Sequence, residues 1–193
     1  VFNLVTKYKI NAILFQHGLN EFNSLNESEI YMNIYFHLSL LKHAFKAKKT
    51  CTFSTLNITA RGGNISCLKY AHEVIKANSN DYLLINAAES GSLKCLKYTF
   101  CVIKATSDEH ILSAAAGSGS LSCLKYTHKV IKATNDLSVI SSAAESGSLV
   151  CLKYAHKVIK ATDFFVLFKF IKNISCIEYY KNHIIKQTYF INQ

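Results

Sequence analysis

The sequence LSCLKYTHKVIKAT, residues 121–134, occurs in four closely similar copies along the chain. The other copies are ISCLKYAHEVIKAN from Ile65, LKCLKYTFCVIKAT from Leu93 and LVCLKYAHKVIKAT from Leu149. One cysteine marks the same position in each copy, every 28 residues: Cys67, Cys95, Cys123 and Cys151. A fixed period of this length is typical of solenoids, in which small units stack and bury one another's faces.

The composition favours a folded helical chain. Of the 193 residues, 50% are apolar, which excludes intrinsic disorder, and proline is absent, as uninterrupted helices tolerate. No apolar run reaches the length of a membrane span, because the best candidate, residues 164–171, is short and contains Lys169. The chain begins at Val1 in mid-pattern and without Met, so we expect a fragment of a longer protein.

The cysteines indicate packing rather than cross-linking. Their number, seven, is odd, and none form closely spaced pairs. Neighbouring helices lie about 8–10 Å apart, whereas a disulfide needs Cα atoms within about 7 Å. We therefore expect the four repeated cysteines to be small buried side chains that neither bridge nor share a metal. A reducing, intracellular and cytoplasmic location follows as the expectation.

Each copy follows a short run of helix-forming residues and a turn. In the second copy the run YLLINAAE, residues 82–89, closes on Ser90 and Gly91. Glycine just past a helix end predicts a left-handed cap, and Ser92 then begins a second helix as its N-cap. The equivalent turn glycines are Gly63, Gly119 and Gly147, and the equivalent N-caps are Asn64, Ser120 and Ser148.

The second helix carries an apolar stripe at helical spacing, which predicts its buried face. The stripe contains Cys95, Leu96, Thr99, Phe100, Val102 and Ile103. The tyrosines of the CLKY motif are constant, so we expect them to pack between repeats. The histidines of the copies share a position with Phe100, which indicates a packing role rather than metal binding.

The stretch AAESGSLKCLKY, residues 87–98, resembles the ankyrin repeat. It is most similar to the short CLKY-H arrays of giant DNA viruses of amoebae and of protists. The resemblance implies an all-α solenoid of helix-turn-helix units, and a host-cell cytoplasmic location if the source is viral. The Thr-Pro-Leu-His opening of the family is missing, and a period shorter than the usual 33 or so leaves the β-hairpin fingers reduced or absent.

We expect one solenoid over residues 1–193. Its regular repeats are predicted at 54–81, 82–109, 110–137 and 138–165. Degenerate repeats are predicted before them, at 1–53, and a degenerate cap repeat after them, at 166–193.

Differences between the copies suggest where a partner binds. They concentrate on the outer side of the first helix, the face that ankyrin-like arrays use to hold partners, although neutral drift on an exposed face accounts for them equally well. The candidate partner-binding residues are Arg61, Tyr82, Ile85, Asn86, Glu89, His110 and Glu145.

The net charge of +10 is located on the second helices, whose only acid is Glu73. Two parallel lysine rows are predicted there: Lys69, Lys97, Lys125 and Lys153 in one, Lys76, Lys104, Lys132 and Lys160 in the other. Such rows either keep an apolar stack soluble or attract an acidic protein, an anionic membrane or nucleic acid. Nucleic acid is disfavoured because no exposed aromatic residues interleave with the lysines and no nucleic-acid-binding motif is present.

No catalytic, cofactor or metal motif is recognisable, since phosphate loops, HExxH and paired carboxylates are missing. We therefore expect a non-enzymatic, monomeric scaffold that binds another protein, with no cofactor. The alternative is a basic module that binds an anionic partner through the lysine rows.

Overall fold

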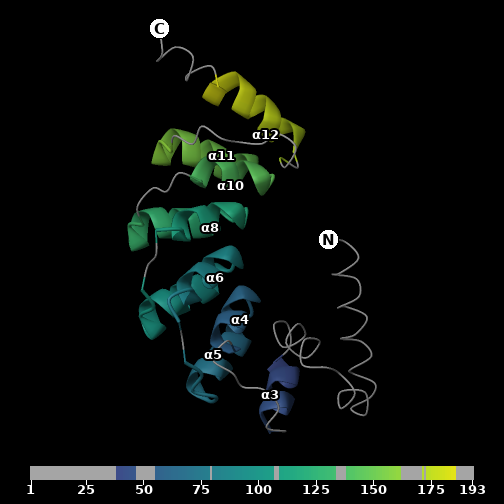
Figure 1. The fold of residues 1–193 in the computed structure, drawn as a ribbon, viewed down its shortest axis with the longest axis vertical. Helices are drawn as coiled ribbons and strands as arrows, with labels where there is room; N and C mark the ends of the chain where they lie inside the picture. The colour runs from purple at the N-terminus through teal and green to yellow at the C-terminus, as the bar shows by residue number, and fades with distance from the viewer. Residues whose placement is uncertain are drawn as a thin grey trace.

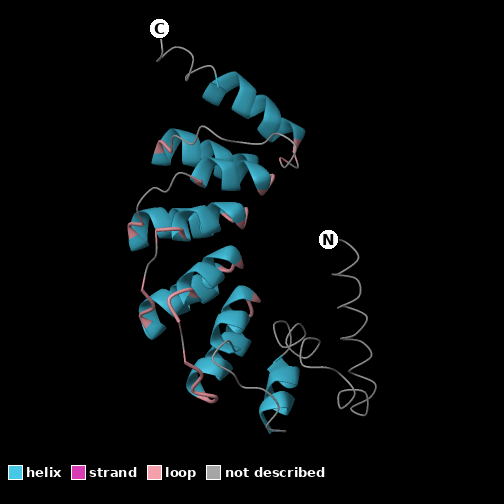
Figure 2. Cartoon of the chain, viewed as in Figure 1, coloured by secondary structure: helices cyan, strands magenta, loops and turns pink. Residues whose placement is uncertain are grey.

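The copies fold into helix pairs that pack one on the next (Figure 1). The structure, a computed structural model, describes residues 38–46, 55–78, 80–106, 109–133, 138–161, 171 and 173–185. These residues form helices, turns and loops and no strand (Figure 2), which confirms the all-α prediction. The predicted N-terminal repeats, 1–53, lie outside the described residues except for 38–46, as does the predicted cap, 166–193, except for 171 and 173–185.

Each pair consists of a first helix, a glycine turn and a second helix. The first helices are α4 (Thr55–Arg61), α6 (Leu83–Glu89), α8 (Ile111–Gly117) and α10 (Val139–Glu145). The second helices are α5 (Ile65–Glu73), α7 (Leu93–Tyr98), α9 (Leu121–Tyr126) and α11 (Leu149–Tyr154). Two further helices, α3 (Leu38–Lys46) and α12 (Ile174–Tyr179), pack against α5 and α11 respectively.

The first helices pack directly on one another, α4 on α6, α6 on α8 and α8 on α10. Their alanine pairs make this close approach possible, because Ala87, Ala88 and their equivalents have no exposed surface. The second helices add one leucine and one cysteine per repeat to the same core. Leu96, Leu124 and Leu152 are fully buried, as the sequence predicted, and so are the four repeated cysteines.

The glycine turns have the predicted conformation. Gly91 has φ of 69°, and the turn glycines of the other three copies have φ between 69° and 77°. Asn64, Ser92 and Ser120 accept hydrogen bonds from backbone amides at the start of the second helices, as N-caps do. The side chain of Ser148 makes no such bond, although its backbone is extended in the same way.

The second helices end differently from the prediction. After Tyr98, Tyr126 and Tyr154 the chain continues as π-helical turns, η2 (Thr99–Ile103), η3 (Thr127–Ile131) and η4 (Ala155–Ile159), and η6 (Tyr180–Ile185) follows α12. A π-turn places an extra residue in each hydrogen-bonded ring, which shifts the side chains that follow. Val102 is consequently 54% exposed, so its place in the buried stripe was wrong, whereas Thr99 is buried and Phe100 and Ile103 are half-buried.

Candidate interaction groove

An open groove of about 390 Å³ crosses the first helices α6, α8 and α10. Its lining residues are Ile85, Glu89, His110, Ser113, Ala114, Gly117, Ser118 and Ser142. All of them occupy positions at which the repeats differ from one another, Ser118 only because the first copy has Gly62 there. The groove therefore lies on the face where variation between the copies is concentrated.

Gly117 opens the centre of the groove. The equivalent residues on the flanking helices are Glu89 and Glu145, so a long side chain is missing only on α8. Gly117 has no positive φ, and a Cβ added there would have a single neighbour within 4 Å, Ser142 Cβ at 3.7 Å. Glycine inside a helix costs about 1 kcal/mol relative to alanine, and neither backbone conformation nor crowding demands it here. What its presence provides is space.

The groove is rich in hydrogen-bond acceptors. The Ser113 hydroxyl donates to the His110 carbonyl oxygen at 2.9 Å, and the Ser118 hydroxyl donates to the Ala115 carbonyl oxygen at 2.7 Å. Each hydroxyl uses its only proton on the backbone, so its oxygen can only accept further hydrogen bonds, and that of Ser118 already accepts one from the Ser120 backbone N–H at 3.2 Å. The Glu89 carboxylate adds a negative charge. Its ion pair with Arg61, at 3.4 Å, is exposed, so the carboxylate remains accessible to a partner.

The structure brings some of the candidate partner-binding residues together and leaves others apart. Ile85, Glu89 and His110 line the groove, and Arg61 reaches its rim through Glu89. Tyr82, Asn86 and Glu145 are not among the lining residues. Tyr82 and Glu145 are exposed, and Asn86 is half-buried.

Sequence reasoning did not select five of the lining residues, Ser113, Ala114, Gly117, Ser118 and Ser142, as candidates. Four of them, Ser113, Ala114, Gly117 and Ser142, nevertheless occupy the same variable positions as the candidate residues Ile85, Asn86 and Glu89. The available signal was the loss of a long side chain at position 117 between two glutamates. Small residues mark a hollow, whereas the candidate residues have larger or charged side chains.

The first lysine row is engaged within the stack. The Nζ atoms of Lys69, Lys97, Lys125 and Lys153 lie over the tyrosine ring of the following repeat, 5.6–5.8 Å from its centroid. Lys42 makes the same contact with Tyr70, at 5.7 Å. A cation over an aromatic face is attracted by the ring quadrupole. These lysines therefore contribute to the contact between repeats, in addition to carrying charge at the surface.

The tyrosine hydroxyls complete this contact, as the predicted packing between repeats requires. His72, His128 and His156 each place Nδ1 at 3.0 Å from the tyrosine hydroxyl of the next repeat, with the two rings edge to face. Phe100 replaces the histidine in the second copy and keeps the edge-to-face contact with Tyr126. The neighbouring Cys101 then supplies the hydroxyl's partner at 3.4 Å.

Burial and these partners raise the pKa of the tyrosines. Desolvation, with the hydrogen bond to Glu73 and its charge, raises the pKa of Tyr98 to about 12. Desolvation and the Cys101 thiol raise the pKa of Tyr126 to about 12 as well. Desolvation also raises the pKa of Tyr154 and Tyr179. Ionisation of these phenols would place a negative charge between repeats.

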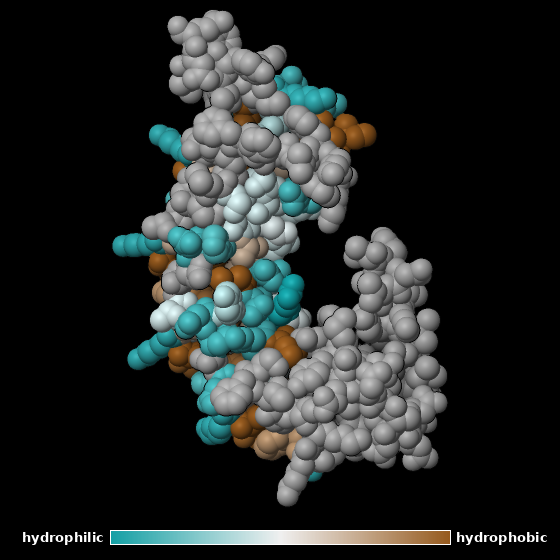
Figure 3. Space-filling model, in the orientation of Figure 1, coloured by the Kyte–Doolittle hydropathy of each residue, from teal (hydrophilic) through white to brown (hydrophobic). Residues whose placement is uncertain are grey.

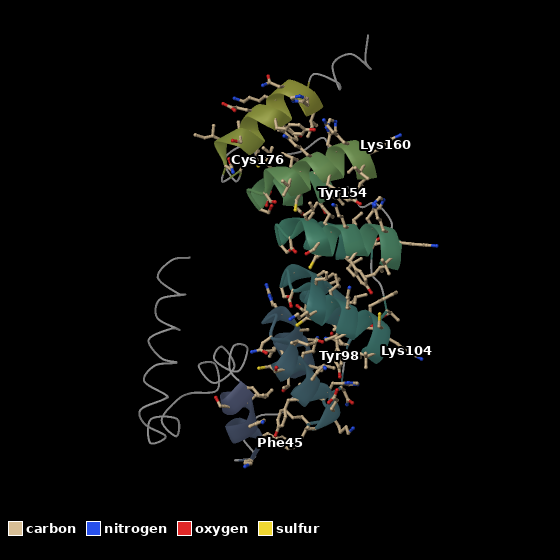
Figure 4. All side chains as sticks on the ribbon, turned by 180° about the vertical axis from the view of Figure 1, so that it is seen from behind. Phe45, Tyr98, Lys104, Tyr154, Lys160 and Cys176 are labelled. Carbon is tan, nitrogen blue, oxygen red and sulfur yellow. The ribbon has the colours of Figure 1, made fainter. Side chains whose placement is uncertain are left out.

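The second lysine row has an unusual backbone. Lys76, Lys104, Lys132 and Lys160 all have φ of 56–57°, in the left-handed region that favours glycine. Lys104, Lys132 and Lys160 cap the π-helical turns of their repeats, Lys76 follows the end of α5, and all four are exposed. Lys104 and Lys160 lie at the outer edge of the stack, whereas Tyr98 and Tyr154 lie between its layers (Figure 4).

Among the described residues, no three His, Cys, Asp or Glu side chains gather as metal ligands would. The cysteines described are free thiols: Cys101 is exposed, and Cys67, Cys95, Cys123, Cys151 and Cys176 are buried. None of the helices described is both long enough and apolar enough for a membrane span.

No family model, curated protein or solved structure matches the chain. The features of the chain that bear on function are consequently the groove, the lysine rows and the differences between repeats.

Proposed function

We propose that this chain is an ankyrin-like solenoid that serves as a non-enzymatic scaffold and holds a segment of another protein in the groove across α6, α8 and α10. The observation that carries this proposal is the coincidence of two independent features. Every residue that lines the groove occupies a position at which the four copies differ, although not every variable position lines it.

Neutral drift alone would not create a hollow. Drift at exposed positions changes side chains without regard to their neighbours, whereas here the missing side chain at Gly117 lies between helices that carry Glu89 and Glu145. The small residues Ser113, Ala114 and Ser142 surround the same point. A single side chain of a partner has room to enter there.

The chemistry of the groove favours a hydrogen-bond donor as its occupant. Glu89 and the serine oxygens are acceptors, and Ile85 and Ala114 provide an apolar wall for an aliphatic stem. Lysine and arginine combine such a stem with a cationic donor group. We therefore expect the partner segment to insert a lysine or arginine over Gly117, with its charged end near Glu89.

Selection of peptides on the full chain tests this proposal. Linear peptides would be selected from a random displayed library and their affinity measured by calorimetry with the native chain. We expect the selected peptides to share a basic residue. In the Gly117→Gln variant, whose side chain fills the groove without adding charge, we expect their affinity to fall at least about tenfold, the value of one lost charged contact.

Val150→Gln is the matched control. Val150 is 57% exposed on α11 and does not line the groove, so the same side chain is added elsewhere on the surface. Gly117→Gln removes a helical glycine and should not destabilise the fold. Equal affinity for both variants, or selected peptides without basic residues, would contradict the proposal.

A further inference from the structure

A row of valines lies exposed beside the second lysine row. Val74, Val102, Val130 and Val158 are 51%, 54%, 51% and 49% exposed. Each is followed, two residues later, by the left-handed lysine of its repeat. We call these eight residues the Val–Lys edge: Val74, Val102, Val130, Val158, Lys76, Lys104, Lys132 and Lys160.

Packing within the stack does not explain why this edge is the same in all four copies. A valine with half of its surface in water contributes little to a core. A left-handed position favours glycine, and an L-residue pays about 1–2 kcal/mol to occupy it. Contact with tyrosine rings explains the first lysine row. In the part of the chain that the structure describes, Lys104 and its equivalents make no such contact with an aromatic ring.

Two of its lysines place the edge on the outer side of the curved stack. Lys104 and Lys160 lie along that side (Figure 4). The same side, on the left in Figure 3, shows projecting hydrophilic side chains with hydrophobic patches between them. Each of the four repeats therefore adds one positive charge and one exposed valine to the edge.

We propose that the Val–Lys edge binds an extended, acidic segment of another polypeptide, independently of the groove. Successive repeats are spaced by roughly one helix packing distance, about 10 Å. A segment in the extended polyproline II conformation rises about 3.1 Å per residue with three residues per turn, so one turn spans one repeat and every third side chain points to the same face. A segment with Asp or Glu at every third position pairs one carboxylate with each lysine and places an apolar side chain against each valine.

Nucleic acid and membranes fit this edge less well. The phosphates of a nucleic acid would make no favourable contact with the exposed valines. Recognition of bases needs exposed aromatic residues, which the Val–Lys edge does not contain. A flat bilayer touches an outwardly curved edge at only a few repeats at once. A flexible chain follows the curve and contacts every repeat.

The test uses defined probes and the full chain. The probes are a fluorescent twelve-residue peptide of four Glu-Val-Ser triplets, a peptide of the same composition with its glutamates grouped at one end, vesicles of equal parts phosphatidylcholine and phosphatidylserine, and single-stranded oligothymidylate. We expect the triplet peptide to bind more tightly than the grouped one and than either other probe.

Two charge-matched triple variants locate the site. Lys104→Gln/Lys132→Gln/Lys160→Gln should weaken binding of the triplet peptide about tenfold, as three exposed ion pairs imply. Lys97→Gln/Lys125→Gln/Lys153→Gln removes the same charge from the other row and should change binding by less than about threefold. Val102→Ser/Val130→Ser/Val158→Ser should also weaken binding, with circular dichroism confirming that all three variants are folded.

Three outcomes would overturn the proposal. Equal losses in the two lysine variants would mean that only overall charge matters. Tighter binding of the vesicles or the oligonucleotide would identify another class of partner. Failure of the triplet peptide to bind, or to bind better than the grouped peptide, would show that the spacing of the edge has no role. None of these outcomes bears on the groove, whose own test uses different variants.

Discussion

The first and second helices of each pair belong to the same stack, but they differ in how much their residues vary between the four copies. On the second helices the lysine, tyrosine and leucine of CLKY are constant, and each contacts the core or the next repeat. On the first helices the outward positions change from copy to copy and line a groove. The comparison teaches that constancy of the CLKY residues reports contacts between repeats, and that variation marks positions at which the stack tolerates different side chains. The Val–Lys edge, which is constant yet exposed, is the exception.

Removing a core leucine should produce the largest difference between the two kinds of position. Leu124→Ala deletes a fully buried side chain in the middle of the stack and should lower the free energy of unfolding by about 2–5 kcal/mol. Ser142→Ala, at a variable position of α10, should change it by less than about 0.5 kcal/mol. Urea denaturation followed by circular dichroism measures both, and similar values would break the comparison.

The glycine turn should give the next largest effect. Gly91→Val places a β-branched residue at φ of 69° and its Cβ 3.5 Å from Ser120 Cβ in the next turn, so we expect a loss of more than about 1–2 kcal/mol. Glu89→Ala, two residues earlier on the groove face, should be nearly silent. Melting temperatures of the two variants measure the difference, and equal shifts would refute the role assigned to the turn.

The tyrosine contacts should produce a smaller effect that depends on pH. Because folding raises the pKa of Tyr98 and Tyr126 from 10.0 to about 12, the folded state holds their protons more tightly than the unfolded state does. Their contribution to stability is therefore complete below pH 10 and is lost as the pH rises toward 12. Stability should fall over this window more steeply in the native chain than in Tyr98→Phe/Tyr126→Phe.

The double phenylalanine variant also serves as its own control at neutral pH. It keeps the rings, and with them the lysine contacts, and loses only the hydroxyl hydrogen bonds, so each site should cost about 1 kcal/mol. Identical slopes for the two proteins above pH 10 would show that the hydroxyls do not link the repeats.

The sequence was sufficient for the regular parts of this fold. The period, the turn glycines, three of the four N-caps and the buried leucines each follow from a local rule that needs no knowledge of neighbouring repeats. The π-turns could not be predicted in this way, because an α-helical stripe and a π-turn differ only in where Val102 and Ile103 point. The left-handed lysines escaped prediction because glycine is the residue normally expected there.

The groove was predicted in part. Ile85, Glu89 and His110 were among the candidate residues. The hollow itself depends on small residues of three helices, which meet only when the repeats stack. The partners of the tyrosine hydroxyls were likewise hidden, since they belong to the preceding repeat. What the sequence could not provide is the contact across the interface between units.

An alanine scan of the third copy tests the central claim most directly. Each described residue of 110–133 is changed to alanine, or to glycine where alanine is native, and the free energy of unfolding of every variant is measured. The account predicts large losses at Leu112, Leu124 and Tyr126 and small changes at the exposed groove positions His110 and Gly117. Val130 and Lys132 should also be nearly silent, because they are constant yet exposed. Losses at His110 and Gly117 as large as that at Leu124 would contradict the claim that variation marks positions at which the stack tolerates different side chains.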